Sequence, residues 1–256
     1  TSDSIQSLYS KVFVRQNEES FLEGIVKGLE YFGGAPQKII FDNARVAVKE
    51  GFGHHAKATD KYLALSAHYS FRPVFCNPAQ GHEKGLVEDL VGLVRRNFFV
   101  PVPNISTIEE LNTKLLEYCS MYRDHKIHGK SMTVEEMAVN CKERWIPLPP
   151  YRYDTSNTPQ VKADDFSLVR FDHNKYSVPY QYSSKNITVK SSGNKVRMMY
   201  NGNIIAEYDR DYRHNCTHYR LEHYIGLIER RPRSVYNAAP IKDTVPKEFY
   251  QFLMKL

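Results

Sequence analysis

Apolar residues in the N-terminal part of the chain recur with two different periods, and this alternation predicts short strands separated by helices. Residues 8–14 alternate polar and apolar, and residues 38–41 and 71–75 are short apolar runs, as expected of strands. Residues 21–32 and 62–69 place apolar side chains at helical spacing instead. The residues suited to cap these two helices are Asn17 and Thr59. The strand–helix–strand–helix–strand order predicts an α/β layer fold with some parallel strand pairing.

Three more helices are predicted before the composition changes. Residues 86–94 carry apolar side chains at helical spacing. Residues 106–109 (Ser-x-x-Glu) and 133–136 (Thr-x-x-Glu) have the form of capping boxes, which begin helices. The proline-rich segment 147–150 then predicts a semi-rigid linker.

Beyond this linker the pattern is that of short strands. Asn201-Gly202 separates two of them and is the dipeptide most typical of a tight β-hairpin. Several short strands with turn residues between them predict a small β-barrel of the SH3-like kind. The expected strands are residues 166–171, 176–178, 187–189, 196–200 and 204–208. Residues 219–256 are predicted to be helical and then extended.

The composition sets limits on this picture. No apolar run in the 256 residues approaches the ~20 residues that a membrane-spanning helix needs. The polar start, Thr1-Ser2-Asp3-Ser4, lacks Met and the charged region of a signal peptide, so we expect a fragment or a processed product. The four cysteines form no Cys-x-x-Cys pair, which fits a reducing cytoplasm better than a disulfide framework. The net charge of +6 is compatible with a polyanionic partner without establishing one.

Two acids stand at positions suited to metal-dependent phosphodiester chemistry. Asp42 directly follows the apolar run 38–41, and Glu88 lies on a predicted helix behind the glycine-containing turn 77–85. Ligands of open α/β sheets gather at the carboxyl ends of strands, which is where Asp42 falls. Two divalent metals held by carboxylates activate an attacking oxygen and stabilise a leaving one. Magnesium prefers such oxygen ligands.

The helix that carries Glu88 also carries cations on the same face. Lys84 precedes Glu88 by four residues, and Arg95 and Arg96 follow it by seven and eight. A carboxylate for metal flanked by cations for phosphates is a plausible active-site stripe. The other candidate DNA contacts near this turn are Gln80 and His82.

Each of these residues also has an ordinary structural interpretation. Asp42 with Asn43 can simply begin a turn, and Glu88 with Lys84 can form a surface ion pair. Two sets of Cys and His are conceivable zinc ligands, but neither has clean finger spacing, and surface histidines are the better interpretation. The sets are Cys119, His125 and His128, and His214, Cys216, His218 and His223.

Cations also alternate with apolar residues along the predicted barrel strands. Such alternation is the normal solvent face of strands, and it fits a surface that tracks phosphates equally well. The cations are Lys185, Lys190, Lys195 and Arg197.

Several segments of the sequence together resemble a known family. They are Phe41-Asp42-Asn43, Phe75-Cys76-Asn77-Pro78, Gly81-His82-Glu83-Lys84-Gly85-x-Val87-Glu88 and Arg95-Arg96-Asn97-Phe98-Phe99-Val100-Pro101. This set resembles the DDE integrase/transposase superfamily, and more closely the IstA-type transposases of two-gene bacterial insertion sequences. Asn174-Lys175-Tyr176-Ser177-Val178-Pro179 and Ile205-Ala206, with Arg210 and Tyr212, resemble that family's C-terminal barrel.

The resemblance implies a ribonuclease H-like integrase core, incomplete at its start, followed by the small SH3-like barrel. Asp42 and Glu88 would be the second and third acids of a DDE triad that binds Mg²⁺, with Mn²⁺ able to substitute. The implied reaction is cleavage at an element end and transfer of the freed 3′-hydroxyl to target DNA. The implied partners are double-stranded DNA, further copies of the chain and an AAA+ ATPase helper of the IstB type. The implied location is the bacterial cytoplasm, at the nucleoid, with no membrane.

The family's first acid and its N-terminal helix-turn-helix region are expected to lie outside this chain, in which Asp3 is the only acid near the start. We therefore expect incomplete catalysis by the chain alone. A catalytically incomplete DNA-binding or assembly module of a transposase is the alternative, and a stand-alone nuclease of the same fold is a third. The expected divisions are the core at 1–103, its helical continuation at 104–146, a linker at 147–162, the barrel at 163–214 and a tail at 215–256.

Overall fold

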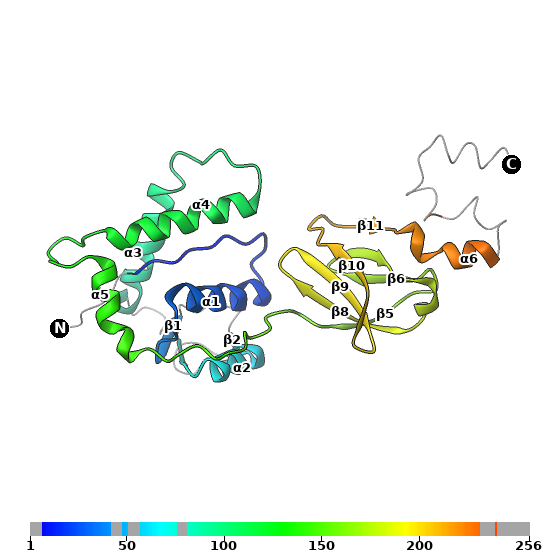
Figure 1. Ribbon diagram of the computed structural model, residues 1–256, viewed down its shortest axis with the longest axis horizontal. Coiled ribbons are helices and arrows are strands. Elements are labelled where there is room, and N and C mark those ends of the chain that lie inside the picture. The colour runs from blue at the N-terminus through cyan, green and yellow to red at the C-terminus, as the bar shows by residue number, and fades with distance from the viewer. Residues whose placement is uncertain (1–6, 42–47, 51–56, 76–80, 231–238, 240–256) are drawn as a thin grey trace. The chain divides into compact units, whose positions relative to one another are not determined.

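The computed structural model describes residues 7–41, 48–50, 57–75, 81–230 and 239, with the backbone alone for residues 81–88, 141–142 and 228. The chain divides into two compact units, Thr1–Thr155 and Ser156–Leu256. The first combines helices with short strands and the second consists mainly of strands (Figure 1). A mixed α/β architecture is therefore confirmed. No helix in the described ranges has the length and apolar character that crossing a bilayer would require.

Helices and short strands alternate along the first unit. The strands are β1 (Lys38–Phe41), β2 (Val48–Glu50), β3 (Lys57–Ala58) and β4 (Arg72–Phe75). The helices are α1 (Glu18–Phe32), α2 (Asp60–His68), α3 (Gly81–Asn97), α4 (Ile108–Met121) and α5 (Val134–Cys141), with short 3₁₀ turns η2 (Tyr122–Asp124) and η3 (Lys142–Arg144). β1 and β4 pair in parallel and β2 and β3 pair antiparallel. Parallel pairing needs a long crossover connection, which here contains α2.

α1 begins and ends where its sequence predicts. The backbone of Asn17 is extended, and its Oδ1 accepts a hydrogen bond from the Ser20 N–H at 2.8 Å, which satisfies one of the unpaired donors of the first turn. Gly33 ends the helix with φ at +74°, a conformation that favours glycine. The buried face is Leu22, Val26 and Leu29.

The core of the first unit surrounds the fully buried ring of Tyr62 on α2. This ring lies 5.2 Å from that of Phe41 and 6.1 Å from that of Phe75, centroid to centroid, in edge-on geometry. Phe41 and Phe75 are the last residues of β1 and β4 and are direct register partners. One aromatic cluster therefore fixes the carboxyl ends of both parallel strands.

Residues 8–14, predicted as a strand, form no strand with any other described residue. The side chain of Asn112 on α4 holds this extended segment instead. Its Oδ1 accepts from the Val12 N–H at 2.8 Å, and its Nδ2 donates to the Val12 carbonyl at 3.0 Å. One amide thus makes both hydrogen bonds that a neighbouring strand would make. The small core beneath the segment contains Leu8, Val94, Leu115 and Cys119.

The capping box predicted at the start of α5 is confirmed. The Thr133 hydroxyl accepts from the Glu136 N–H at 3.2 Å, and the Glu136 carboxylate accepts from the Thr133 N–H at 2.8 Å. This reciprocal pair satisfies two backbone donors at the helix start.

The start of α4 lies one residue later than predicted. Thr107, not Ser106, takes the extended cap conformation, and its hydroxyl accepts from the Glu110 N–H at 3.1 Å. The Glu110 carboxylate accepts from the Ser106 N–H at 3.2 Å, one residue before the cap. The predicted pair was Ser106 and Glu109, so the box exists in a shifted register.

Residues 146–155, here called the strap, pack along the first unit. Arg152 donates to the carboxylates of Glu23 at 2.6 Å and Glu30 at 2.8 Å, both on α1. The Thr155 hydroxyl donates to Glu23 at 2.7 Å. The contact boundary between the units follows directly after Thr155, inside the predicted linker 147–162.

Trp145, the only tryptophan of the chain, directly precedes the strap. Its ring meets that of Phe32 edge-on at 5.8 Å. A Cβ at Gly34 would come within 3.1 Å of the indole, so glycine permits this close approach.

The second unit contains two small sheets. The strands are β5 (Gln160–Lys162), β6 (Leu168–Phe171), β7 (Asn174–Ser177), β8 (Asn186–Ser192), β9 (Lys195–Tyr200), β10 (Asn203–Asp209) and β11 (Thr217–His218). The 3₁₀ turns η4 (Tyr180–Tyr182) and η5 (Leu221–His223) and the helix α6 (Ile225–Arg230) complete the unit. The sheet orders are β10-β9-β8-β5 and β11-β7-β6. A shared core lies beneath both sheets and includes Val169, Tyr176, Ile187 and Met198, all fully buried.

The predicted hairpin at Asn201-Gly202 is confirmed. Both residues have positive φ, +49° and +80°, and they join the antiparallel strands β9 and β10. Two consecutive residues of this kind form the turn whose twist matches that of the flanking strands.

A buried polar cluster joins β7, β10 and η5. The Ser177 Oγ lies 2.8 Å from both the Tyr208 hydroxyl and the His223 Nδ1. Burial lowers the pKa of His223 and raises the pKa of Tyr208 to about 12. Because Ser177 is fully buried, this Ser–His pair is a structural contact and not an accessible nucleophile.

Candidate functional site

The candidate site begins at the carboxyl ends of two neighbouring parallel strands. Phe41 and Phe75 are the terminal register partners of β1 and β4. In the sequence, Asp42 follows Phe41 and Cys76 follows Phe75. Asp42 and Gln80 lie outside the described residues. The described fold therefore supplies the parallel strand pair that precedes Asp42, which is the setting that the sequence predicted.

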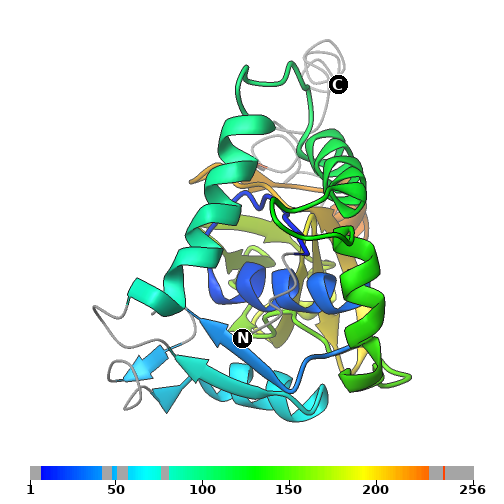
Figure 2. The same cartoon turned by 90° about the vertical axis from the view of Figure 1, so that its left-hand side faces the viewer.

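The helix that carries Glu88 starts shortly after this strand pair. α3 begins at Gly81, six residues after Phe75. Its first turns lie on the side to which the β1 and β4 arrows point (Figure 2). His82, Lys84 and Glu88 all belong to α3, although only their backbone is described. The helical position predicted for Glu88 is confirmed, while the role of its side chain stays a prediction.

Two exposed arginines end the same helix. Arg95 and Arg96 lie in the last turn of α3, where cations interact favourably with the helix dipole. Arg95 is seven residues after Glu88, so helical geometry places the two positions on one face. The Arg96 guanidinium folds back over the helix, where a Cβ at Gly92 would meet it at 3.0 Å.

One hollow of about 390 Å³ runs beside this helix. Arg95, Val91 and Leu90 line it from α3, and residues 7–10 and Phe32 line it from the other side. The hollow brings one candidate DNA-contact residue next to an apolar wall. No acidic residue is among those that line it.

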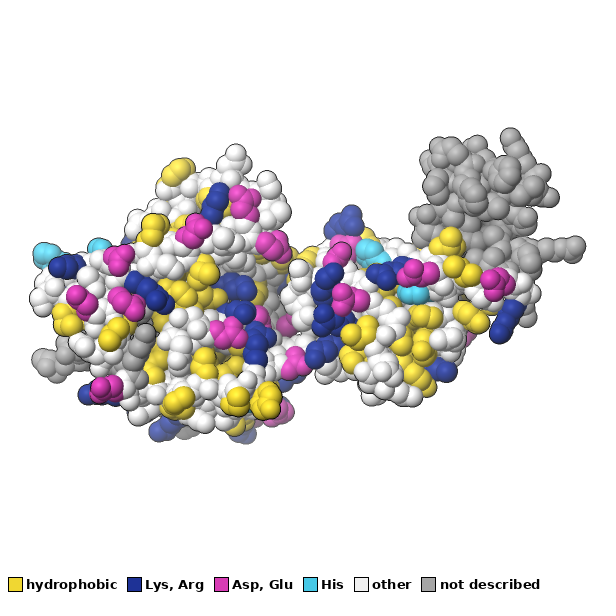
Figure 3. Space-filling model, in the orientation of Figure 1, with side chains coloured by type: hydrophobic (Ala, Val, Ile, Leu, Met, Phe, Trp, Pro, Cys, Tyr) yellow, Lys and Arg dark blue, Asp and Glu magenta, His cyan; other side chains and the backbone are white. Residues whose placement is uncertain are grey.

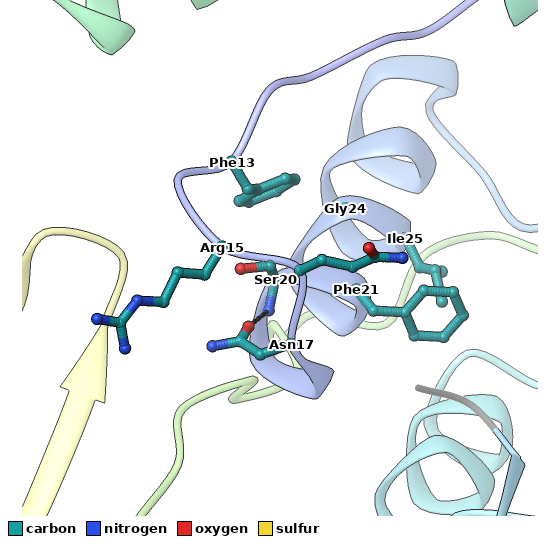
Figure 4. A pocket seen from close by; sticks show the side chains of 8 residues that line it. Phe13, Arg15, Asn17, Ser20, Phe21, Gly24 and Ile25 are labelled. Atoms are coloured by element: carbon teal, nitrogen blue, oxygen red, sulfur yellow. Dashed lines mark hydrogen bonds between the residues drawn. The ribbon is translucent and has the colours of Figure 1, made fainter. Parts of the chain in front are cut away.

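A second hollow, of about 450 Å³, lies at the start of α1 (Figure 4). Phe13, Phe21 and Ile25 give it an apolar lining, and Arg15 points away from the helix. Asn17 also lines this hollow, and its Oδ1 already accepts the capping hydrogen bond from the Ser20 N–H of α1. None of the described residues that line this hollow is an acid.

The histidines proposed as possible zinc ligands have other contacts. His125 stacks on Tyr122, His218 stacks on Tyr176, and His223 is bonded to Ser177. No group of three or more His, Cys, Asp or Glu suited to a metal occurs among the described residues. Asp42 and the side chain of Glu88 lie outside the described residues, so this absence does not bear on their role.

Two cations of the four-stranded sheet are paired with acids. Arg197 bonds Glu207 at 2.6 Å, and Lys195 bonds Asp209 at 2.8 Å, across the β9–β10 ladder. These pairs hold the pKa of both carboxyls below their usual range. Lys and Arg side chains accordingly stand beside acidic ones over this unit (Figure 3). This favours the solvent-face interpretation of Lys195 and Arg197 over a phosphate-tracking one.

Comparison with known proteins first gives a class. Residues 148–219 match the family described as Mu transposase, C-terminal domain. This match covers most of the strap and the strands of the second unit. The class with which the chain shares sequence is therefore that of transposases.

Individual relatives make the similarity more specific. A transposase of Aminobacter aminovorans is 30% identical, over 96% of this chain and 51% of the relative. The Pseudomonas aeruginosa transposase for insertion sequences IS1326/IS1353 is 28% identical over 92% and 48%. The P. aeruginosa transposase for IS21 is 26% identical over 87% and 59%. These matches confirm the resemblance to IstA-type DDE transposases. The chain spans about half the length of the curated relatives it matches.

A solved structure also aligns with the chain. It is a chain of the simian T-cell lymphotropic virus intasome in complex with PP2A regulatory subunit B56 gamma, with 15% identity and a TM-score of 0.37. The alignment covers 72% of this chain and 58% of that one. At this TM-score the likeness does not define the fold.

Proposed function

We propose that the chain is part of a DDE-type DNA transposase, which cuts DNA at the ends of a mobile element and joins them to target DNA. The sequence similarity to insertion-sequence transposases along nearly the whole chain carries this proposal. The parallel β1–β4 pair followed by α3 supports it, because such strand ends are where α/β enzymes gather ligands. We assign the first unit to a ribonuclease H-like core and the second to an SH3-like barrel.

In this proposal Asp42 and Glu88 hold a divalent metal. Their carboxylate oxygens suit Mg²⁺, and Mn²⁺ can substitute. When bound, the metal activates the attacking oxygen and neutralises charge on the leaving one. Asp42, which follows β1 in the sequence, and Glu88 on α3 would be the residues that hold the metal. An acid on a further strand completes the triad.

The cations of α3 are assigned to the DNA substrate. Arg95 and Arg96 are exposed, and each is able to bind a phosphate through its planar guanidinium. The remaining proposed DNA contacts are Gln80, His82 and Lys84. Such contacts position DNA without reading its sequence. The working assembly is a homo-multimer on paired DNA ends at the bacterial nucleoid, assisted by an AAA+ ATPase of the IstB type.

The exchanges Asp42→Asn and Glu88→Gln test the assignment in the intact transposase. Each removes a metal ligand while keeping the shape of the side chain. We expect Mg²⁺-dependent cleavage of an end-bearing duplex to fall at least about a hundredfold, since the metal contributes several kcal/mol of transition-state stabilisation. Gel-shift binding of the same duplex is expected to stay within about twofold.

Asp89→Asn is the matched control, because Asp89 is an exposed acid beside Glu88 on the same helix. Its cleavage rate should equal that of the wild type. Undiminished cleavage by either ligand variant would reject the metal-site assignment. End binding by an intact wild-type protein that never cleaves would support the alternative, a DNA-binding or assembly module.

A further inference from the structure

Arg170 and Lys175 form a pair of like charges near the hairpin end of β6 and β7, where Arg170 is exposed and Lys175 is half-buried. They are direct cross-strand partners in the β6–β7 ladder, so both side chains point to the same face. The neighbouring rungs, such as Val169 with Tyr176, face the core and are buried. Like charges directly opposite each other destabilise a sheet. The fold therefore retains an unfavourable pair where a neutral one would be more stable.

No acid compensates this pair within the described part of the chain. Neither Arg170 nor Lys175 takes part in any ion pair found among the described residues. Two acids of this unit, Asp172 and Asp211, bond other arginines. Asp172 lies 3.3 Å from Arg210, and Asp211 lies 2.8 Å from Arg213. Both carboxylates are largely buried, 15% and 11% exposed, and each is bonded to another arginine.

The four-stranded sheet of the same unit also has a rung of like charges, Lys190 with Arg197. There Lys195 and Arg197 each bond an acid on the adjacent strand. The two rungs thus differ in compensation, because an acid bonds Arg197 and no acid bonds Arg170 or Lys175 among the described residues. We therefore expect the Arg170–Lys175 rung to attract an anion more strongly than the compensated β9–β10 ladder does.

We propose that Arg170 and Lys175 form a contact site for the phosphodiester backbone of double-stranded DNA. This inference rests on the proposed function, which supplies DNA as the polyanion. Adjacent strands are about 4.8 Å apart, so both cations can reach one phosphate group or the two that flank it. The binding of phosphates compensates the repulsion that the free protein tolerates. The site positions DNA and does not read its sequence.

The double variant Arg170→Ala/Lys175→Ala tests this inference in the chain of residues 1–256. We expect affinity for a random-sequence duplex to fall about tenfold or more near 0.1 M salt, and the log–log salt dependence to become about two units less steep. The melting temperature should stay unchanged or rise, because the opposed charges are gone. A chain with the conservative exchange Arg170→Lys and an unchanged Lys175 should keep most of the wild-type affinity for the duplex.

Lys162→Ala/Arg230→Ala is the matched control, since it removes two exposed cations of the same unit and changes the net charge equally. Its affinity should stay close to that of the wild type. Equal loss in both double variants would overturn the site, because net charge alone would then explain binding. Equal affinity for poly-glutamate and DNA would overturn the assignment to phosphodiesters. Failure of this chain to bind DNA would overturn the inference, while cleavage by the intact protein would still decide the proposed function.

Discussion

His223 is the residue through which mild acid acts most directly on the second unit. Burial lowers its pKa below the ordinary value of 6.5, so the unfolded chain takes up a proton before the folded one does. The free energy of unfolding is therefore complete above about pH 6.5 and falls as the pH drops from there toward the folded pKa. We expect the unit to melt at lower temperature at about pH 5.5 than at about pH 7.5. Circular dichroism melts at the two pH values would show the difference.

His223→Gln should remove most of this pH dependence, because glutamine cannot be protonated in this range. His214→Gln is the control, since His214 is exposed. The acids with lowered pKa in the same unit, Glu207 and Asp209, lose their contribution only below about pH 4.5, outside the tested window. An unchanged pH dependence in His223→Gln would contradict the role of this residue.

The sequence predicted the structural position of Glu88 but not the pairing of Arg170 with Lys175. Glu88 was placed on a helix from its motif, and α3 confirms the position. The Arg170–Lys175 pair was not predicted from the sequence. A two-residue turn at Asp172-His173 makes residues 170 and 175 partners, and neither turn residue is the glycine or asparagine that usually marks such a hairpin.

The side chain of Asn112 holds the extended segment 8–14 by the two backbone hydrogen bonds that a neighbouring strand would make. Asn112→Ala removes both hydrogen bonds to the Val12 backbone, and the expected loss in free energy of unfolding is about 1–3 kcal/mol. Urea unfolding would measure the loss. Amide hydrogen exchange should accelerate in residues 8–14 before it does in α1.

Thr113→Ala is the matched control for this exchange, because Thr113 is the neighbouring residue of α4 and bonds only within its own helix. Its unfolding free energy should change by no more than about 0.5 kcal/mol. Similar losses in the two variants would indicate that α4 itself, and not the contact with Val12, determines stability there.

Local chemistry explains which elements could be predicted from the sequence. The caps of α1 and α5 and the Asn201-Gly202 turn depend on residues within a few positions of one another, so their patterns sufficed. Residues 8–14 were mistaken for a strand, since an alternating pattern cannot show that the partner is an amide 100 positions away. β5 and β11 were missed because two or three residues carry no periodicity.

At the scale of the whole chain, each unit has its own core. The buried core of the second unit is formed by residues between 163 and 208, and the strap ends at Thr155. Asn157 already bridges to Ser191 of the second unit. We therefore expect a separately expressed chain of residues 156–256 to fold and to unfold cooperatively in urea.

Val196→Asp is the matched negative variant, because Val196 is fully buried and an unpaired charge there is strongly destabilising. Dispersed amide resonances from the isolated unit, and their loss in this variant, would bear out the expectation. A disordered spectrum from the wild-type unit would show that its core depends on residues before 156.

The single tryptophan makes one unit optically distinct from the other. Trp145 packs on Phe32 and Gly34 of the first unit, and the second unit contains no indole at all. Trp145 directly precedes the strap, so its fluorescence reports on the packing of this segment against the end of α1 and not on the strands of the second unit. The emission of the natural protein is a built-in probe of the element that joins the proposed catalytic core to the rest of the chain.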